Sequence, residues 1–298
     1  MAEKDIIEKT LEDYNDVFAD IVNVLLFNGE RRMQEDELQN IKARSMFKAD
    51  GKLHEQERDV VKRWIRENVR LAFIGMENQT NIDEMMPIRV MSYDGIMYKS
   101  QLAEIEKCRR REKKPPVPVP VITLVIYFGA GQWEKTSLRE IMDIPDYLDD
   151  YVSDYRINVF DIKKLTREQV DMFKSDFYIL ADYFYKVYHE KEYKPDERTI
   201  EHVDEVFKMM TVFTGDDRYE QAVMEIPDDS RRELRMCEVL DKIEARGIKI
   251  GETRGVEMGE QKLSRLIGCL RASDRNDDID RVIADKDYRE KLYEEFGI

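Results

Sequence analysis

Three polar side chains, Asp59, Glu77 and Gln79, border an otherwise apolar stretch of the sequence. Residues 72–80 read AFIGMENQT, and side chains of a strand alternate between its two faces, so Glu77 and Gln79 would share one face. If Asp59 faced Glu77, the two carboxylates would repel, and such a pair is usually stabilised by a cation or by one retained proton. Oxygen ligands of this kind suit Mg²⁺ or another hard divalent cation, with water and substrate phosphate completing the shell. The pattern therefore indicates phosphoryl-transfer chemistry.

Gln79 has a narrower role in such a site, because its amide does not accept a proton near neutral pH. It would orient a water or hold the phosphate, which leaves deprotonation to metal-bound water. Each acid also has a simpler interpretation when taken alone. Glu77 suits a polar strand end at the rim of a sheet, and Asp59 suits the charged run HEQERD, so the chemistry depends on their pairing.

A β-hairpin would bring the two acids together. The segments 60–65 and 69–76 are rich in β-branched and aromatic residues, and they flank a Glu-Asn dipeptide whose Asn tolerates a tight turn. A three-residue connection at 67–69 would place Asp59 opposite Glu77, with Cα atoms about 5 Å apart. A two-residue loop would instead pair Asp59 with Met76, so the site depends on the register.

Further elements surround this hairpin. A helix with apolar residues at helical spacing runs from Tyr14 to an Asn-Gly stop at 28–29, and Pro87 suits the first turn of a second helix. The apolar run 121–129 is typical of a strand covered on both faces, which we expect at the centre of the sheet. A strand is predicted at 155–162, a short one around 45–48, and helices over 166–190 and 198–215, the first opening with the capping pattern Thr166 to Gln169.

Together these features resemble the PD-(D/E)XK nuclease superfamily. Asp59 followed by GMENQT resembles its Asp...Glu-x-Lys signature, with Gln79 in place of the lysine. The chain is more closely similar to the branch of recombination-promoting nucleases and putative transposases, which often carries this Gln. The similar segments are DYNDVFADIVNVLLFNG, MMPIRVMSYDGIMYKSQL, VITLVIYFG and RGIKIGETRGVEMG, which together span most of the chain.

The resemblance implies an α/β fold with a restriction-endonuclease-like αβββαβ core and a mixed central sheet, followed by a helical C-terminal region. It implies divalent-metal-dependent cleavage of DNA, with Asp59, Glu77 and Gln79 as catalytic residues and the two acids as metal ligands. Asp16 on the first helix matches an acidic position of the family and would support the site. The missing lysine charge would slow the reaction or abolish it.

The charge of this 298-residue chain limits the kinds of partner that it can bind. Its net charge of −15 opposes a broad electrostatic grip on nucleic acid or an anionic membrane, so a DNA-binding face would be local. The run KCRRREKK is the candidate, either as a solvated loop or as a contact to the phosphate backbone beside the metal site through Arg109, Arg110, Arg111, Lys113 and Lys114. We expect a cytoplasmic protein without a membrane span, whose three separated cysteines are plain thiols.

Near the C-terminus, glycines recur every four residues at 247, 251, 255 and 259 within a helical pattern. Four glycines in a helix cost roughly 4 kcal/mol relative to Ala, which close packing in a dimer seam would offset. A frayed linker before a small helical module is the alternative. The domains expected are a nuclease-like core at 1–165, a helical extension packed on it at 166–229, and the Gly-repeat helix with its module at 230–298.

Three functions remain open from the sequence. The first is a metal-dependent DNA endonuclease, linked to transposition or recombination and so to mobile elements. The second is a catalytically inactive nuclease fold that acts as a DNA-binding or protein-interaction module, which the net charge and the glycines favour modestly. The third is a nuclease acting on RNA, because the same site chemistry serves both nucleic acids.

Overall fold

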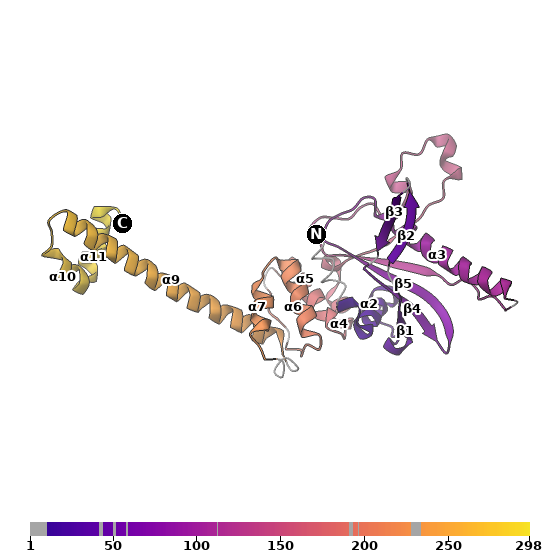
Figure 1. The fold of residues 1–298 in the computed structure, drawn as a ribbon, viewed down its shortest axis with the longest axis horizontal. Helices are drawn as coiled ribbons and strands as arrows, with labels where there is room; N and C mark the ends of the chain where they lie inside the picture. The colour runs from indigo at the N-terminus through magenta and orange to yellow at the C-terminus, as the bar shows by residue number, and fades with distance from the viewer. Residues whose placement is uncertain are drawn as a thin grey trace. The chain divides into compact units, whose positions relative to one another are not determined.

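The computed structural model describes residues 11–41, 44–49, 52–57, 59–111, 113–190, 193–195, 197–227 and 234–298 (Figure 1). Contacts divide the chain into two compact units, Met1–Val239 and Leu240–Ile298. The first unit contains the sheet, and the second is helical. Within the described ranges, no helix is both long enough and apolar enough to cross a membrane. The three cysteines are free thiols, as predicted.

The sheet has five strands in the order β1-β4-β5-β6-β7. Strands β1, β4 and β5 pair antiparallel, whereas β6 pairs parallel with β5 and β7 parallel with β6. The strands are β1 Leu38–Asn40, β4 Val60–Arg66, β5 Val69–Gln79, β6 Val121–Tyr127 and β7 Asn158–Asp161, and a separate hairpin is formed by β2 Arg44–Ala49 and β3 Lys52–Glu57. The mixed sheet confirms the predicted fold class. The predicted centre of the sheet was wrong by one strand, because β5 occupies the middle and β6 lies beside it.

Helices α2 (Asn15–Phe27) and α3 (Met86–Arg110) cover opposite faces of this sheet. Lys62 of β4 lies over the ring of Phe18 from α2, with its ammonium 5.2 Å from the ring centroid. On the other face, Thr123 of β6 donates a 2.7 Å hydrogen bond to the buried Asp94 of α3. The elements α2, β1, β4, β5, α3 and β6 thus follow the αβββαβ order that the resemblance implied, with the β2–β3 hairpin inserted.

The end of α2 and the start of α3 lie where the sequence predicts them. Asn28 closes α2 in the left-handed conformation, at φ 51° and ψ 43°. Pro87 lies in the first turn of α3, where its missing N–H costs no intrahelical hydrogen bond. The basic run continues α3 to Arg110 instead of forming only a loop.

The β4–β5 hairpin reaches the predicted register by a different route. Its connection has two residues, Glu67 and Asn68, both with positive φ, so the predicted three-residue loop is wrong. A β-bulge between Trp64 and Ile65 then shifts the pairing by one residue. Beyond the bulge, Val60 pairs with Met76, which is the register that a three-residue loop would have given.

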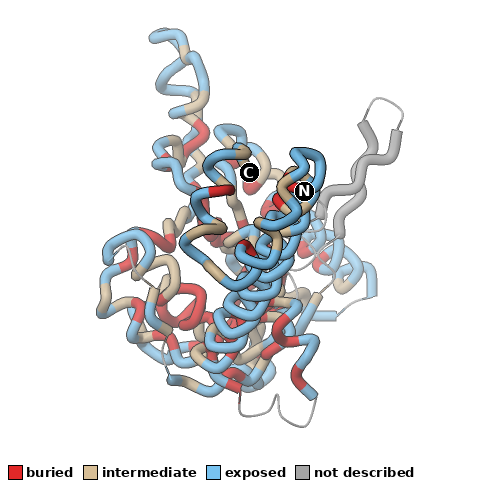
Figure 2. Tube along the Cα trace, turned by 90° about the vertical axis from the view of Figure 1, so that its left-hand side faces the viewer, coloured by how far each residue is buried: buried red, intermediate tan, exposed pale blue. Residues whose placement is uncertain are grey.

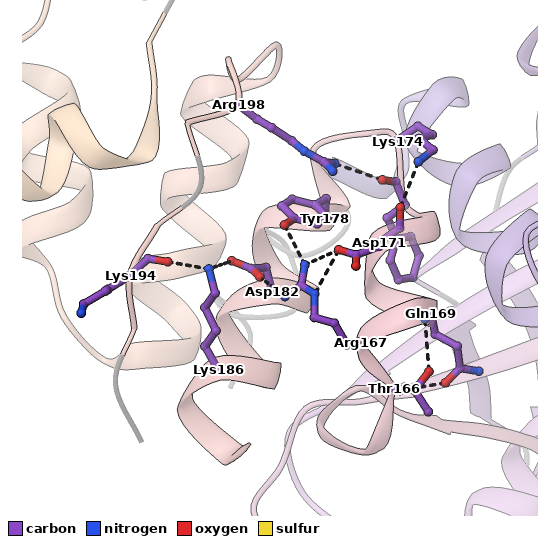
Figure 3. Close-up of polar contacts among 11 residues, drawn as sticks. Thr166, Arg167, Gln169, Asp171, Lys174, Tyr178, Asp182, Lys186, Lys194 and Arg198 are labelled. Atoms are coloured by element: carbon purple, nitrogen blue, oxygen red, sulfur yellow. Dashed lines mark hydrogen bonds and ion pairs between the residues drawn. The ribbon is translucent and has the colours of Figure 1, made fainter. Parts of the chain in front are cut away.

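A helical layer follows β7, made of η4 Ile162–Lys164, α4 Arg167–Met172, α5 Phe177–His189, α6 Val203–Thr214 and α7 Arg218–Met224. Thr166 and Gln169 form the predicted capping box, but the helix that they open ends at Met172, so the single predicted helix is two. Arg167 fastens α4 to α5 through hydrogen bonds to Asp182 at 2.6 Å and to the Tyr178 hydroxyl at 2.8 Å (Figure 3).

The C-terminal unit contains most of α9 (Met236–Ala272), together with α10 (Asp278–Ala284) and α11 (Lys286–Phe296). Its core consists of Leu266, Leu270, Val282 and Leu292. The glycine repeat lies inside α9, so that segment is helical, and residues 244–262 are exposed throughout (Figure 2). A Cβ atom added at any of the four repeat glycines would meet nothing within 4 Å. The glycines therefore serve no packing contact among the described residues of this chain.

Candidate metal and phosphate site

The end of the β4–β5 hairpin brings Asp59 and Glu77 together. Because Val60 pairs with Met76, one further step of the same register would put Asp59 opposite Glu77, with Cα atoms about 5 Å apart. The carboxylate of Asp59 accepts a 2.7 Å hydrogen bond from the backbone N–H of Asn78. That bond fixes the Asp59 side chain at the rim of β5. The hairpin register and this hydrogen bond agree with the juxtaposition predicted from the sequence.

Glu77 is buried at this rim, with 2% of the residue exposed. Its Oε1 accepts a hydrogen bond from Gln79 Nε2 at 3.4 Å, so the two side chains share one face of β5. The same oxygen forms an ion pair with Arg89, which lies in the N-terminal part of α3, and accepts a 2.5 Å hydrogen bond from its Nη2. A buried carboxylate needs such a partner, because an isolated buried charge is strongly disfavoured.

Arg89 is held by three groups. Besides Glu77, it contacts Asp83 through Nη1 at 2.9 Å and the Tyr93 hydroxyl at 3.3 Å. Burial opposes its ionisation, but the charge of Glu77 and the hydrogen bonds to Tyr93 and Asp83 outweigh burial and raise the pKa of Arg89 above its usual value. Burial, reinforced by the charges of Glu77 and Asp59, raises the pKa of Tyr93 as well. Both acids therefore act electrostatically on the same tyrosine.

Sequence reasoning did not identify Arg89 and Tyr93 as members of the site. The available signal was their spacing of four residues on a helix that begins shortly after the Glu-x-Gln motif. Such a spacing shows that the two side chains share a face of α3. It does not show that this face turns towards Glu77.

The end of β5 is also positioned by its neighbour β6. The backbone N–H of Phe128 donates to the Gln79 carbonyl at 2.9 Å, which continues the parallel pairing past the motif. At Gly129, an added Cβ would lie 2.2 Å from the Thr80 carbonyl oxygen and 2.6 Å from the ring of Tyr127. Only a glycine therefore allows the two segments that follow β5 and β6 to approach this closely beside Gln79.

Asn78 points to the opposite face, as the strand period requires. Its side-chain amide donates to the buried carboxylate of Glu12 at 2.8 Å, on the face that α2 covers. Asp16 belongs to α2, so it lies across the sheet from Glu77. The predicted supporting acid instead contacts His202, with Oδ2 and Nε2 3.2 Å apart.

Asp16, Glu201 and His202 form a second cluster, whose ligand atoms lie within 4.8 Å of one another. In the parts of the chain that the structure describes, this is the sole group of three or more acidic, histidine or cysteine residues with metal-binding spacing. A cavity of about 340 Å³ adjoins it and is lined by Asp16, Glu201 and residues of α2. The cavity is therefore separate from the Asp59–Glu77 pair.

The basic residues lie at the other end of α3. Arg109, Arg110, Arg111, Lys113 and Lys114 are all exposed at or just beyond the C-terminus of that helix. Arg89 and Arg110 are separated by 21 residues, or about 30 Å along the helix axis. The expectation that this patch lies beside the acidic pair is therefore wrong, although both lie along one helix.

The donor set of the acidic pair fits a hard divalent cation. The two carboxylates offer hard oxygen ligands, and Asp59 and Glu77 would be the residues that hold Mg²⁺. The ion pair with Arg89 adds a condition: the guanidinium already contacts Oε1 of Glu77, so a cation at that oxygen would have to displace it.

One comparison with known proteins identifies a family. The sequence profile described as "Putative transposase, YhgA-like" matches residues 37–212, which include Asp59, Glu77, Gln79 and Arg89. Neither the curated proteins nor the solved structures contain a match. The match covers more than half of the chain and includes the sheet, α3 and the site at the rim of β5. The chain therefore belongs to the family of YhgA-like putative transposases.

Proposed function

We propose that this protein is a divalent-metal-dependent DNA endonuclease of the PD-(D/E)XK type, which hydrolyses phosphodiester bonds during transposition or recombination. The observation that carries the proposal is the placement of Asp59 opposite Glu77 at the rim of β5. The αβββαβ order of the elements and the Glu-x-Gln motif support it. Membership of a putative transposase family supports DNA as the substrate.

Each residue has a role that follows from its chemistry. Asp59 and Glu77 would bind Mg²⁺, which would polarise the scissile phosphate. Asp59 is oriented for this task by the N–H of Asn78, and Glu77 by the amide of Gln79. Gln79 is uncharged, so it positions a water or a phosphate oxygen and transfers no proton.

Cleavage of supercoiled plasmid tests the proposal directly. Purified protein should nick or linearise plasmid in Mg²⁺ and should be inactive in EDTA. Asp59→Asn and Glu77→Gln each remove one charge with little change in shape, and each should reduce the rate at least ~100-fold if the residue binds the ion. Glu84→Gln is the matched control, because Glu84 is an exposed acid that pairs with Lys135.

Two results would count against the assignment. Cleavage that persists in both acidic variants would exclude Asp59 and Glu77 as the metal ligands. Cleavage of a single-stranded RNA control at a higher rate than DNA would move the substrate to RNA while leaving the site unchanged.

The second candidate function is a catalytically inactive nuclease fold that binds DNA or a protein partner. The ion pair between Arg89 and Glu77 favours it, because a resident cation competes with Mg²⁺ for the same carboxylate. The neutral Gln79 favours it as well. Binding of DNA without turnover in Mg²⁺ or Mn²⁺, measured on the same preparation, would distinguish this function from the first.

A further inference from the structure

Position 79 lacks a charge, but the site does contain a cation. Gln79 Nε2 and Arg89 Nη2 both lie within hydrogen-bonding distance of one atom, Oε1 of Glu77. The guanidinium of Arg89, from α3, therefore lies where the end of the side chain at position 79, from β5, also lies.

We propose that Arg89 supplies from α3 the positive charge that a lysine at position 79 would provide, and that its ligand in the working site is a phosphate oxygen of the nucleic acid. This inference rests on the proposed nuclease function. In the state described by the structure, the same guanidinium neutralises Glu77. Arg89 would leave that carboxylate for the phosphate when Glu77 holds a divalent cation.

The accessibility of Arg89 fits this dual use. Its side chain is 37% exposed, whereas that of Glu77 is 3% exposed, so the guanidinium extends from the buried acid towards solvent. Asp83 holds its second amino group at 2.9 Å, and an arginine with two fixed partners keeps its orientation when one of them is replaced. A guanidinium is also the preferred cation for phosphate, because its planar donors match pairs of phosphate oxygens.

The position of Arg89 in α3 is not explained by helix stability. The N-terminus of a helix carries a partial positive charge, which favours acidic side chains in the first turn. The first turn of α3 has no acidic residue, and Arg89 is the fourth residue of that helix. Both the arginine and the helix end therefore contribute positive potential beside Glu77, and a bound phosphate would benefit from both.

Burial of the ion pair alone offers a competing explanation, in which Arg89 only ties α3 to β5. The chain contains a matched control for that role. Arg70 of β5 forms a two-pronged ion pair with Glu104 of α3, at 2.9 and 3.1 Å, on the same pair of elements. Arg70→Met thus removes a β5–α3 tie of the same kind away from the acidic pair.

The first experiment measures ion binding, which needs no catalysis. Titration calorimetry with Mg²⁺ alone should show about 3- to 10-fold tighter binding for Arg89→Met than for the unchanged protein, because Glu77 loses its competing cation. Arg70→Met should leave the affinity unchanged. Equal or weaker Mg²⁺ binding by Arg89→Met would overturn the proposal, because Arg89 would then not be a cation that a divalent ion displaces from Glu77.

The second experiment measures the phosphate contact in Ca²⁺, with a 20-base-pair duplex and fluorescence anisotropy. Arg89→Met should bind the duplex at least ~10-fold more weakly than Arg70→Met, because a charge-assisted contact is lost. Adding Gln79→Lys to Arg89→Met should restore affinity to within about threefold of the unchanged protein. Equal DNA affinity of the two arginine variants, no restoration by the lysine, or no binding by the unchanged protein would each overturn the proposal.

The outcomes separate this inference from the proposed function. A protein that passes both binding tests but fails to cleave plasmid is not a nuclease, yet Arg89 remains its phosphate contact. A protein that cleaves plasmid while Arg89→Met behaves like Arg70→Met is a nuclease whose charge comes from elsewhere.

Discussion

The carboxylate of Asp59 accepts the backbone N–H of Asn78, the residue directly after Glu77, at 2.7 Å. One hydrogen bond thus connects the start of β4 to the end of β5. It orients Asp59 through the backbone of the residue that follows Glu77. Substitutions of Asp59 should therefore affect function and stability differently. The carboxylate stabilises the fold as a hydrogen-bond acceptor, whereas metal binding needs its charge.

Asp59→Asn keeps an acceptor for this N–H, whereas Asp59→Ala removes it. An unsatisfied N–H that is partly buried costs about 1–2 kcal/mol, so urea unfolding should show that loss for the alanine variant only. Both variants should lose Mg²⁺ binding in calorimetry. Equal unfolding free energies of the two variants would show that the N–H bond contributes no stability.

Gly129→Ala should disturb the end of β5. The new Cβ would lie 2.2 Å from the Thr80 carbonyl oxygen, which is backbone and has little freedom to move. We expect the free energy of unfolding to fall by about 1–3 kcal/mol, together with a loss of Mg²⁺ affinity. Gly95→Ala in α3 is the control, because its Cβ would meet nothing within 4 Å and should stabilise the helix by about 1 kcal/mol. A Gly129→Ala protein as stable as the Gly95→Ala protein would contradict the close approach.

Lys62 should make stability depend on alkaline pH. Burial lowers its pKa to about 8, and the nearby charges of Asp13 and Asp16 only partly offset this. The unfolded chain keeps the lysine protonated up to pH about 10.5, so the unfolded state binds more protons between these values and stability rises with pH. The unchanged protein should gain up to about 3 kcal/mol relative to Lys62→Met between pH 8 and 10.5, measured by urea unfolding. A constant difference between the two proteins over this range would show that Lys62 titrates normally.

The basic end of α3 should contribute to DNA affinity without sequence preference. Exchanging Arg109, Arg110 and Arg111 for glutamate should weaken duplex binding and reduce the slope of log affinity against log salt by about 2–3. Fluorescence anisotropy between 50 and 200 mM salt, roughly the range in which such contacts matter most, measures both quantities. An unchanged slope would identify the run as a solvated helix end.

The glycine repeat of α9 predicts self-association. Its four glycines are exposed in a single chain, and Ile248, Ile250, Val256 and Met258 are exposed around them. Light scattering of the full chain should give the mass of a dimer, and removal of residues 230–298 should give that of a monomer. An equal number of subunits with and without these residues would show that α9 does not mediate association.

The sequence predicted which residues meet at the site better than it predicted the loop and strand geometry that brings them together. Alternation along β5 was sufficient to place Glu77 and Gln79 on one face and Asn78 on the other. The loop length was wrong because a glutamate with positive φ at position 67 has no signal in the residue type. The bulge before Ile65 leaves no trace in an apolar run either, and the two errors cancelled in the register.

Contacts between layers were the part that the sequence did not predict. The helix carrying Asp16 was predicted correctly, but its covering the face of Asn78 instead of the face of Glu77 is a tertiary property. The same reason applies to Arg89, whose contact with Glu77 depends on the rotation of α3 over the sheet. Periodicity identifies which side chains share a helix face, and packing alone decides what that face meets.

The spacing of the α9 glycines sets the handedness of any partner helix. An α-helix has 3.6 residues per turn, so a repeat of four advances each glycine by about 40° around the axis. The bare strip formed by Gly247, Gly251, Gly255 and Gly259 therefore winds as a right-handed spiral instead of running straight. A second helix in contact with that strip would cross it in the right-handed sense, opposite to that of a heptad coiled coil.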